Sequence, residues 1–252
     1  MKHFRFAHFV FGLSLLFLIS CGGGGSEKTS AADSTAMADS AAKAEKAAAE
    51  AKAMSTIVTT TQYFVVVTHK VANYAKWFAA YEGHDSARLA SGLHNYVIGR
   101  GVMKDSNTVL VALKADDTSK AKAFAMNPGM KKTMQKAGVV GAPTISFTTS
   151  VWQDTANIDS KIRSRSTFMV KDWDVWVKTF QDGKQQRMDN GLVDRNVSHD
   201  LDNNKKVYLV LAVTDTAKAM AYWKSDALKK RREEGGVIGE PNRFIYTVVK
   251  RY

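Results

Sequence analysis

The sequence has few of the residues and motifs that indicate a common chemistry. Its 252 residues contain one cysteine, which excludes an intrachain disulfide, and only three prolines. No apolar run reaches the roughly 20 residues that a membrane-spanning helix needs. The histidines and the cysteine lack metal-binding spacing, and neither a Gly-rich phosphate loop nor a G-x-S-x-G nucleophile motif is present. These absences argue against a structural zinc site, a P-loop enzyme and a serine hydrolase of the α/β type.

The N-terminus has the pattern of a secretory signal. Basic residues lie within positions 2–8, and residues 9–19 form an apolar run that is short for a membrane span. The run ends in Leu18-Ile19-Ser20-Cys21, which resembles the lipobox of bacterial lipoproteins. That resemblance implies cleavage before Cys21 and attachment of lipid to its thiol. The alternative is an ordinary cleaved signal followed by a chance cysteine.

Composition divides the chain into four segments. We expect a lipoprotein signal peptide at residues 1–20, a lipid-anchored spacer at 21–58, and two folded repeats at 59–152 and 153–252. The spacer begins with a Gly/Ser stretch typical of flexible coil and continues with Ala, Lys and Glu, which favour a marginal helix. The expected location is the bacterial cell envelope, with palmitate or a similar acyl chain as membrane anchor and the folded part facing the periplasm.

An internal repeat is the strongest signal in the sequence. The offset between equivalent residues is 99 in the first part of each copy and 98 farther along. The best match joins the segment Gly138-Val139-Val140-Gly141-Ala142-Pro143 to Gly236-Val237-Ile238-Gly239-Glu240-Pro241. Other matched pairs are Trp77 with Trp176, Arg88 with Arg187, and Gly92 with Gly191. The repeat predicts two copies of one domain.

Both copies predict the same order of elements. Residues 63–68 form a β-rich run, and the helix after it carries aromatic residues at i, i+3, i+4 and i+7. Asn73 and Asp172 are the expected N-caps of the first helices, and Gly92 and Gly191 their expected ends. Two strands (96–103 and 109–113; 193–199 and 207–213), a second helix (118–137; 216–235) and a last strand (144–151; 244–249) complete the copies. Pro128 should break or kink the second helix of copy one.

The order βαββαβ predicts an α+β fold made of two tandem ferredoxin-like domains. In this arrangement two helices cover one face of a four-stranded antiparallel sheet. The strands are rich in apolar residues, so the uncovered face of each sheet needs a partner, and the other copy is the nearest one. We therefore expect the copies to pack sheet to sheet as an intrachain pseudo-dimer in a monomeric chain.

Four features resemble the dimeric α/β-barrel superfamily that includes antibiotic-biosynthesis monooxygenase-like proteins. They are the aromatic first helix, Arg88 with Gly92, the Ala-rich second helix, and the Gly-Val-Val-Gly-x-Pro segment. The resemblance implies a cavity between two paired domains. Because the superfamily contains cofactor-free oxygenases, haem-handling enzymes and isomerases, it leaves the activity open. By the same analogy His84, His94 and His199 are candidate haem ligands, although none of them recurs in the other copy.

Residues shared by both copies favour structural roles. The stripe of tryptophan and tyrosine in the first helices, at helical spacing, is more typical of core than of a ligand cavity. Arg88 and Arg187 occupy equivalent positions, which favours an ion pair or a contact to carbonyl groups at a helix end.

One difference between the copies indicates a ligand. Phe64 and Val66 in the first strand of copy one correspond to Arg163 and Arg165 in copy two, and alternate residues of a strand share a face. If these side chains point into the cavity between the copies, they favour an anionic ligand. The alternative is an exposed linker end at residues 160–165. The full set of candidate ligand-binding residues is Arg163, Arg165, Arg195, His199 and Arg243.

The net charge of +12 is spread over both copies. This spread is not typical of a nucleic-acid-binding stripe, and it favours attraction to anionic lipid or polysaccharide. Three functions stay open: a lipid-anchored envelope protein that binds a small, anionic ligand between its repeats, a cofactor-free or haem-dependent monooxygenase-like enzyme, and a purely structural envelope protein. The first is preferred, with membrane lipid and a small molecule as partners and with no cofactor or metal. The sequence does not decide whether the chain is an enzyme.

Replacing Cys21 tests the lipid anchor. Cys21→Ser removes the only thiol that can carry a thioether-linked lipid. We expect the variant to leave the membrane fraction or to stall as an unprocessed precursor, and to lose labelling by a fatty-acid analogue. Unchanged fractionation and labelling would contradict the lipoprotein prediction.

Overall fold

The computed structural model describes residues 42–46, 51 and 56–252. The predicted signal peptide, Cys21 and most of the predicted spacer lie outside these residues. Residues 42–46 are helical, as their Ala/Lys/Glu composition favours. Glu50–Tyr252 form one compact unit. Within the described ranges, we find no helix with the length and apolar character that a bilayer crossing requires.

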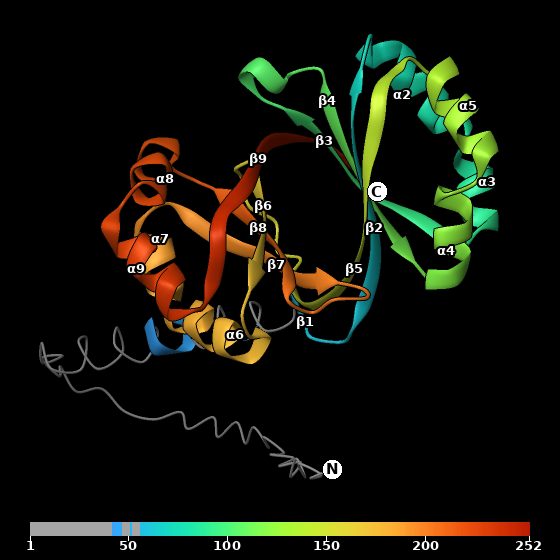
Figure 1. Ribbon diagram of the computed structural model, residues 1–252. Coiled ribbons are helices and arrows are strands. Elements are labelled where there is room, and N and C mark those ends of the chain that lie inside the picture. The colour runs from blue at the N-terminus through green and yellow to red at the C-terminus, as the bar shows by residue number, and fades with distance from the viewer. Residues whose placement is uncertain (1–41, 47–50, 52–55) are drawn as a thin grey trace, which may run out of the picture. The chain divides into compact units, whose positions relative to one another are not determined.

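The order of elements is the same in the two halves of this unit (Figure 1). The first half consists of β2 (Gln62–Val71), α2 (Tyr74–Gly83), α3 (Asp85–Ala90), β3 (Leu93–Gly101), β4 (Thr108–Ala115), α4 (Thr118–Ala125), α5 (Pro128–Lys136) and β5 (Val139–Asp154). The second half consists of β6 (Ile162–Val170), α6 (Trp173–Asp182), α7 (Lys184–Asp189), β7 (Leu192–Asp200), β8 (Lys206–Val213), α8 (Thr216–Trp223), α9 (Asp226–Glu234) and β9 (Val237–Arg251). A short strand, β1 (Ile57–Val58), precedes the first half, and a 3-10 turn, η1 (Met103–Asp105), lies between β3 and β4.

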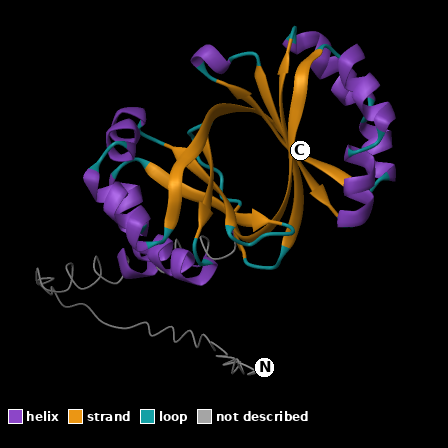
Figure 2. Cartoon of the chain, in the orientation of Figure 1, coloured by secondary structure: helices purple, strands orange, loops and turns teal. Residues whose placement is uncertain are grey.

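The strands form one antiparallel sheet that closes on itself. Within the halves the strand orders are β5-β2-β4-β3 and β9-β6-β8-β7, the same order twice. β3 then pairs with β9, and β5 pairs with β7, so both edges of one half are joined to the other half. The expected pairing of two sheets therefore takes the form of a barrel in which the sheets are continuous. Figure 2 shows the strands around the centre and the helices outside them.

The last strand of each half makes the closure. β5 pairs with β2 as far as Ser150, and its end from Thr148 to Gln153 pairs with β7. β9 pairs with β6 up to Thr247, and its end from Tyr246 to Arg251 pairs with β3. Each of these long strands thus begins in its own half and ends against the other half.

The helices begin and end largely where the sequence predicts. The Asn73 side chain accepts a hydrogen bond from the Lys76 N–H at 2.9 Å, and Asp172 accepts one from the Val175 N–H at 2.9 Å, so both predicted N-caps are confirmed. The predicted first helix is two helices in both halves, since α2 stops at Gly83 and α6 stops at Asp182. Gly92 and Gly191 therefore follow the ends of α3 and α7, with φ of 66° and 68°. This left-handed conformation is cheap only for glycine.

The predicted second helix is two helices in both halves. In the first half Pro128 is the first residue of α5 and Asn127 caps it, so the proline starts a helix there and does not kink a longer one. In the second half no proline marks the break. There α8 ends at Trp223, and Ser225 caps α9 by accepting a hydrogen bond from the Leu228 N–H.

The last two residues of the predicted spacer form a strand of the folded unit. Ile57 and Val58 pair with Asp154 and Gln153 of β5. Two β-branched residues next to an open strand edge favour this addition. The ordered unit consequently begins slightly before residue 59.

Two apolar clusters fill the space between helices and sheet. One lies in each half, around Trp77 and around Trp176, which are 3% and 5% exposed. The aromatic stripe of the first helices is therefore core, as predicted. The opposite face of the sheet encloses the barrel interior, whose residues are described below.

A single half should not be stable as a monomer. Residues 58–152 alone would expose the β3 and β5 edges, which the second half pairs, together with the wall of the barrel interior. We expect this fragment to dimerise or aggregate in sedimentation experiments, whereas residues 56–252 should sediment as a monomer. A stable monomeric single half would contradict the pseudo-dimer.

Candidate functional site

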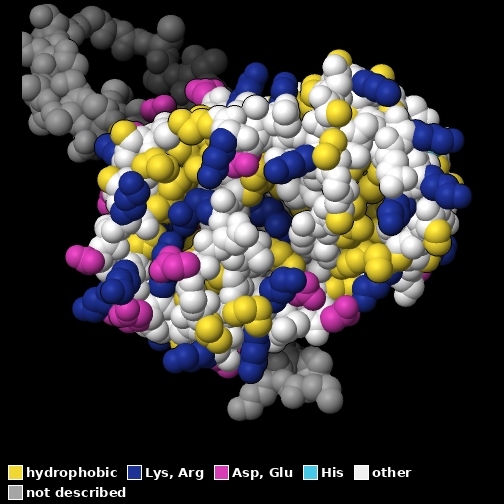
Figure 3. Space-filling view, turned by 45° about the horizontal axis from the view of Figure 1, so that its top comes forward, with side chains coloured by type: hydrophobic (Ala, Val, Ile, Leu, Met, Phe, Trp, Pro, Cys, Tyr) yellow, Lys and Arg dark blue, Asp and Glu magenta, His cyan; other side chains and the backbone are white. Residues whose placement is uncertain are grey.

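The barrel interior contains a cavity. It holds about 720 Å³ of empty space, part of it open to solvent. This agrees with the general behaviour of barrels of about eight strands, whose interiors are filled by side chains or hold one small ligand. Figure 3 shows basic side chains around and within a hollow on one face of the molecule.

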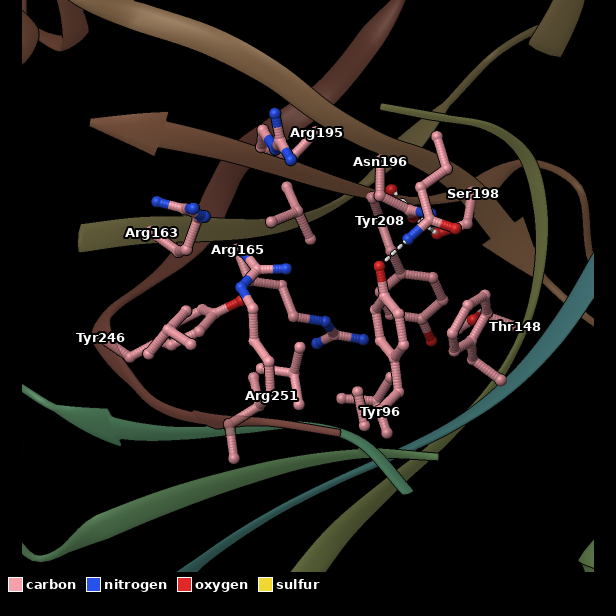
Figure 4. A pocket seen from close by; sticks show the side chains of 18 of the residues that line it. Tyr96, Thr148, Arg163, Arg165, Arg195, Asn196, Ser198, Tyr208, Tyr246 and Arg251 are labelled. Atoms are coloured by element: carbon pink, nitrogen blue, oxygen red, sulfur yellow. Dashed lines mark hydrogen bonds between the residues drawn. The ribbon is translucent and has the colours of Figure 1, made fainter. Parts of the chain in front are cut away.

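The two halves contribute unequal walls to this cavity. From the first half come Phe64, Val66, Tyr96, Leu110, Ala112 and Gln153. From the second half come Arg163, Arg165, Arg195, Arg251, Tyr208 and Tyr246. At equivalent positions, an uncharged residue in the first half stands where each arginine stands in the second: Phe64 for Arg163, Val66 for Arg165, Tyr96 for Arg195 and Gln153 for Arg251. In Figure 4 the four arginines gather on one side, with Tyr96 and Thr148 across from them.

The strand β6 places the first two arginines. Residues 162–170 are a central strand, paired on both sides, so the alternative of an exposed linker end at 160–165 does not hold. Arg163 is 4% exposed, and its Nη1 donates to the carbonyl oxygens of Ser160 (2.6 Å) and Ile162 (2.9 Å). The Arg165 guanidinium carbon lies 4.4 Å from the centre of the Tyr208 ring. Its Nη1 makes one long hydrogen bond to the Thr167 hydroxyl (3.4 Å), and its buried Nη2 has no partner in the described chain.

Only one of the four arginines has a carboxylate partner among the described residues. Arg195 Nη1 lies 3.1 Å from Asp154 Oδ2, and its Nη2 donates to the Ala156 carbonyl at 2.5 Å. Burial, together with the neighbouring charges of Arg251 and Arg195, lowers the pKa of Arg163 to about 10. Burial is also the main cause that lowers the pKa of Arg165 and of Arg195. The cavity is therefore positively charged at neutral pH, with more cations than counter-charges.

A β-bulge in each half aims one side chain into the cavity. The pairing of β3 with β4 skips Tyr96, and the pairing of β7 with β8 skips the equivalent Arg195. Both skipped residues line the cavity. An extra residue of this kind is unpaired in the ladder and changes the direction of the strand.

Arg187 holds the strand immediately before the bulge. Its Nε and Nη2 donate to the two carboxylate oxygens of Asp194 at 2.7 and 2.6 Å, and its Nη1 donates to the Phe180 carbonyl at the end of α6 at 2.6 Å. Arg88 makes the equivalent contacts, from Nε to Asn95 (3.0 Å) and from Nη1 to the Tyr81 carbonyl (2.7 Å). The predicted structural role of these two arginines, contact with carbonyl groups at a helix end, is confirmed.

Two predicted ligand-binding residues lie outside the cavity. His199 faces the helices, where its ring packs edge-on against Trp173 with centroids 4.9 Å apart. The bulge at Arg195 shifts the alternation of β7 by one residue, so Ser198 and not His199 shares the interior with Arg195. Arg243 pairs with Ser166 and also faces the helices, with its guanidinium carbon 4.1 Å from the centre of the Trp223 ring.

Sequence reasoning missed Arg251 and Tyr246. Tyr246 alternates with the other interior residues of β9, but the bulge between Ile98 and Gly99 in the β3–β9 pairing is needed to bring Arg251 to the same face. Gly99 makes room for Tyr246, because a Cβ atom at this position would lie 2.2 Å from the tyrosine ring. The repeat offset of 98 residues was the available signal, because it pairs Arg251 with Gln153 and Tyr246 with Thr148, and both pairs differ between the copies.

A second cavity lies between the helices and the sheet of the first half. It holds about 730 Å³ of empty space including its opening, and its wall is mostly apolar. His69 lines it, is 6% exposed, and has no hydrogen-bond partner for either ring nitrogen within the described residues. Burial lowers the pKa of His69 to about 4, so the ring is neutral at pH 7. The equivalent residue in the second half is Phe168.

The candidate haem ligands that the sequence suggests lie apart from one another. His84 lines the second cavity near its exposed side, His94 pairs with Asp116 at the surface (2.7 Å), and His199 packs on Trp173. In the part of the chain that the structure describes, no three His, Cys, Asp or Glu side chains are grouped to hold a metal ion.

Comparison with solved structures gives matches at low sequence identity. An anthrone oxidase-like protein is 14% identical, with 78% of this chain and 95% of that chain covered and a TM-score of 0.52. A candidate monooxygenase from Fusobacterium nucleatum is 12% identical, with 77% and 94% covered and a TM-score of 0.50. An uncharacterised ferredoxin-fold protein from Listeria monocytogenes, related to antibiotic-biosynthesis monooxygenases, is 7% identical, with 76% and 97% covered and a TM-score of 0.41.

No family model and no curated protein matches the chain. The likeness to the first two structures therefore concerns the ferredoxin-like α+β fold with its large antiparallel sheet, and it carries no statement about activity.

The buried imidazole of His69 should make stability depend on pH. Below its ordinary pKa of 6.5 the unfolded chain binds a proton at His69, whereas the folded chain stays neutral down to about pH 4. Stability should therefore fall as pH falls through this window, by roughly 3 kcal/mol in all. His69→Phe, which introduces the residue of the second half, should remove this loss in urea unfolding between pH 7 and pH 4. An equal pH dependence in both proteins would contradict the assignment.

Proposed function

We propose that this chain is a lipid-anchored envelope protein that binds a small anion inside its barrel. The observation that supports the proposal best is the group of four arginines on one wall of the cavity, of which only Arg195 has a carboxylate partner among the described residues. A buried cation without a counter-charge costs stability, so its presence favours a ligand that supplies the charge. The planar guanidinium group suits carboxylate and phosphate oxygens in particular.

The same cavity offers binding groups more than catalytic ones. Its lining contains the hydroxyl groups of Tyr96 and Tyr246 and a single carboxylate, Asp154, which is held by Arg195 and by the Ala156 N–H. The hydroxyl of Tyr208, which also lines the cavity, donates to Asp200 at 3.0 Å. Burial raises the pKa of Tyr96 and of Tyr246, which keeps these hydroxyl groups protonated as donors. An anion would thus meet cations and hydroxyl donors, and no free base among the lining residues.

The proposal includes the organisation of the whole chain. The two halves are a tandem repeat of one ferredoxin-like domain, and the chain acts as a monomeric pseudo-dimer. Cys21 carries the lipid, and the segment after it separates the barrel from the membrane. The repeated sequence supports the tandem arrangement, and the lipobox pattern supports the lipid on Cys21.

A monooxygenase-like enzyme is the second candidate. The apolar cavity of the first half favours it, because His69 presents an unprotonated nitrogen without a protein partner to a space lined by Trp77, Tyr81 and Met134. The unprotonated nitrogen of His69 could serve as an axial ligand of haem, which would supply the oxidation chemistry. It could equally well serve as the base of a cofactor-free oxygenase. An absorption spectrum of protein purified from its own host separates these two forms. The third candidate, a purely structural protein, offers no reason for the arginine wall.

Removing one arginine should separate binding from stability. Arg165→Met deletes the guanidinium with the unpartnered nitrogen while keeping an apolar side chain of similar length. We expect the variant without added anion to melt at a higher temperature than the parent, because an uncompensated buried charge is gone. Its affinity for phosphate or benzoate, measured by calorimetry on the full chain, should fall about tenfold or more.

The matched control removes an equal charge far from the cavity. Lys230 lies exposed on α9, so Lys230→Met should leave both the melting temperature and the anion affinity nearly unchanged. Equal effects of the two substitutions on binding, or no measurable anion binding by the parent protein, would contradict the proposed function.

A further inference from the structure

The closed barrel places the apolar and the basic wall on opposite sides. Going around the barrel, the strands follow the order β5-β2-β4-β3-β9-β6-β8-β7, and β7 returns to β5. In this circuit β2 and β6 are separated by the same number of strands in both directions, as are β4 and β8. Phe64 and Val66 on β2 therefore lie across the interior from Arg163 and Arg165 on β6.

The wall of the first half is apolar where it faces the arginines. Phe64 is buried and packs edge-on against Tyr96 with ring centroids 5.4 Å apart. Leu110 and Ala112 of β4 extend this surface, and both line the cavity. An ion or a small, fully polar molecule gains nothing from these groups, whereas an apolar body that covers them is removed from water.

The opposite wall presents donors that its own half does not use. Arg165 has an unpartnered Nη2, and Arg163 uses only Nη1 for the hydrogen bonds to Ser160 and Ile162. Both arginines lie on one strand face, so their free nitrogens can meet one oxyanion group. Arg251, the fourth arginine of the lining, is exposed.

We infer that the ligand is an amphipathic organic acid: one oxyanion group, carboxylate or phosphate, on a compact apolar body such as an aromatic ring. The oxyanion group lies against Arg163 and Arg165, and the apolar body lies against Phe64, Val66 and Ala112. This inference rests on the proposed function, because it assigns a ligand class to the same cavity. It also gives a reason for the inequality of the halves, since two identical walls would suit neither end of such a ligand.

Matched ligand pairs test the inference by calorimetry on the full chain. Benzoate is compared with acetate, and phenyl phosphate with inorganic phosphate, so that each pair differs by the apolar body and the two pairs differ by the oxyanion. We expect the aromatic member of at least one pair to bind about tenfold tighter or more, as burial of a ring predicts. The pair with the tighter aromatic member identifies the oxyanion.

A variant of the first-half wall tests whether its apolar character, and not its shape, favours the aromatic ligand. The double substitution Val66→Thr with Ala112→Ser adds hydroxyl groups with little change of volume. It should reduce the preference for benzoate over acetate, or for phenyl phosphate over phosphate, several-fold, because it weakens binding of the aromatic member. Arg165→Met should instead weaken both members of a pair.

The outcomes distinguish the two proposals. If the small anions bind as tightly as the aromatic ones, or if the wall variant keeps the full preference, the amphipathic ligand is wrong while the anion site stands. If no probe binds the parent chain, or if Arg165→Met leaves every affinity unchanged, the proposed function fails and this inference fails with it.

Discussion

The structure depends on the pairing of four strand edges. A four-stranded ferredoxin-like sheet has two open edges, and each would present a row of unpaired N–H and C=O groups. Here the ends of β5 and β9 reach past their own half and satisfy the edges of β7 and β3. This closure encloses the interior, and it also decides which residues face each other across it. The cavity, its unequal walls and the unity of Glu50–Tyr252 all follow from these two pairings.

Equivalent residues in the two halves make equivalent structural contacts. Arg88 and Arg187 fasten the end of the first helix to the strand before a bulge, and the bulge turns Tyr96 and Arg195 toward the interior. The aromatic cluster around each tryptophan covers the outer face of each sheet. The halves also differ where side chains face the cavity, since the arginines of the second half stand opposite uncharged residues of the first.

Burying the cavity arginines lowers the stability of the folded chain, so stability alone does not explain their presence. Burial lowers the pKa of Arg163, Arg165 and Arg195, which means that the surroundings disfavour their charged forms. Arg195 recovers part of the cost from Asp154, and Arg165 recovers part of it from the face of Tyr208. The equivalent positions of the first half hold the uncharged residues Phe64, Val66 and Tyr96, so the barrel itself does not need these charges.

The sequence alone indicated the alternation of strands and helical segments, the N-caps of the first helices and the glycines that follow α3 and α7. These depend on local chemistry: Asn73 and Asp172 cap helices, glycine adopts positive φ after α3 and α7, and an aromatic stripe at helical spacing is buried. It also brought Arg163 and Arg165 together, because alternation within one strand is local. The break between α8 and α9 at Ser225 was missed, since serine is common and no proline stood beside it.

Only the tertiary structure decided how the sheets join and which side chains share the interior. Sheet register and bulges depend on partner strands that are far away in the sequence, so alternation could not be carried past Arg195 to His199 or along β9 to Arg251. Arg243 was assigned to the wrong face for the same reason, because its pairing with Ser166 sets its direction. The isolation of the His69 ring is likewise a product of packing, since nothing adjacent to it in the sequence excludes water from its two nitrogens.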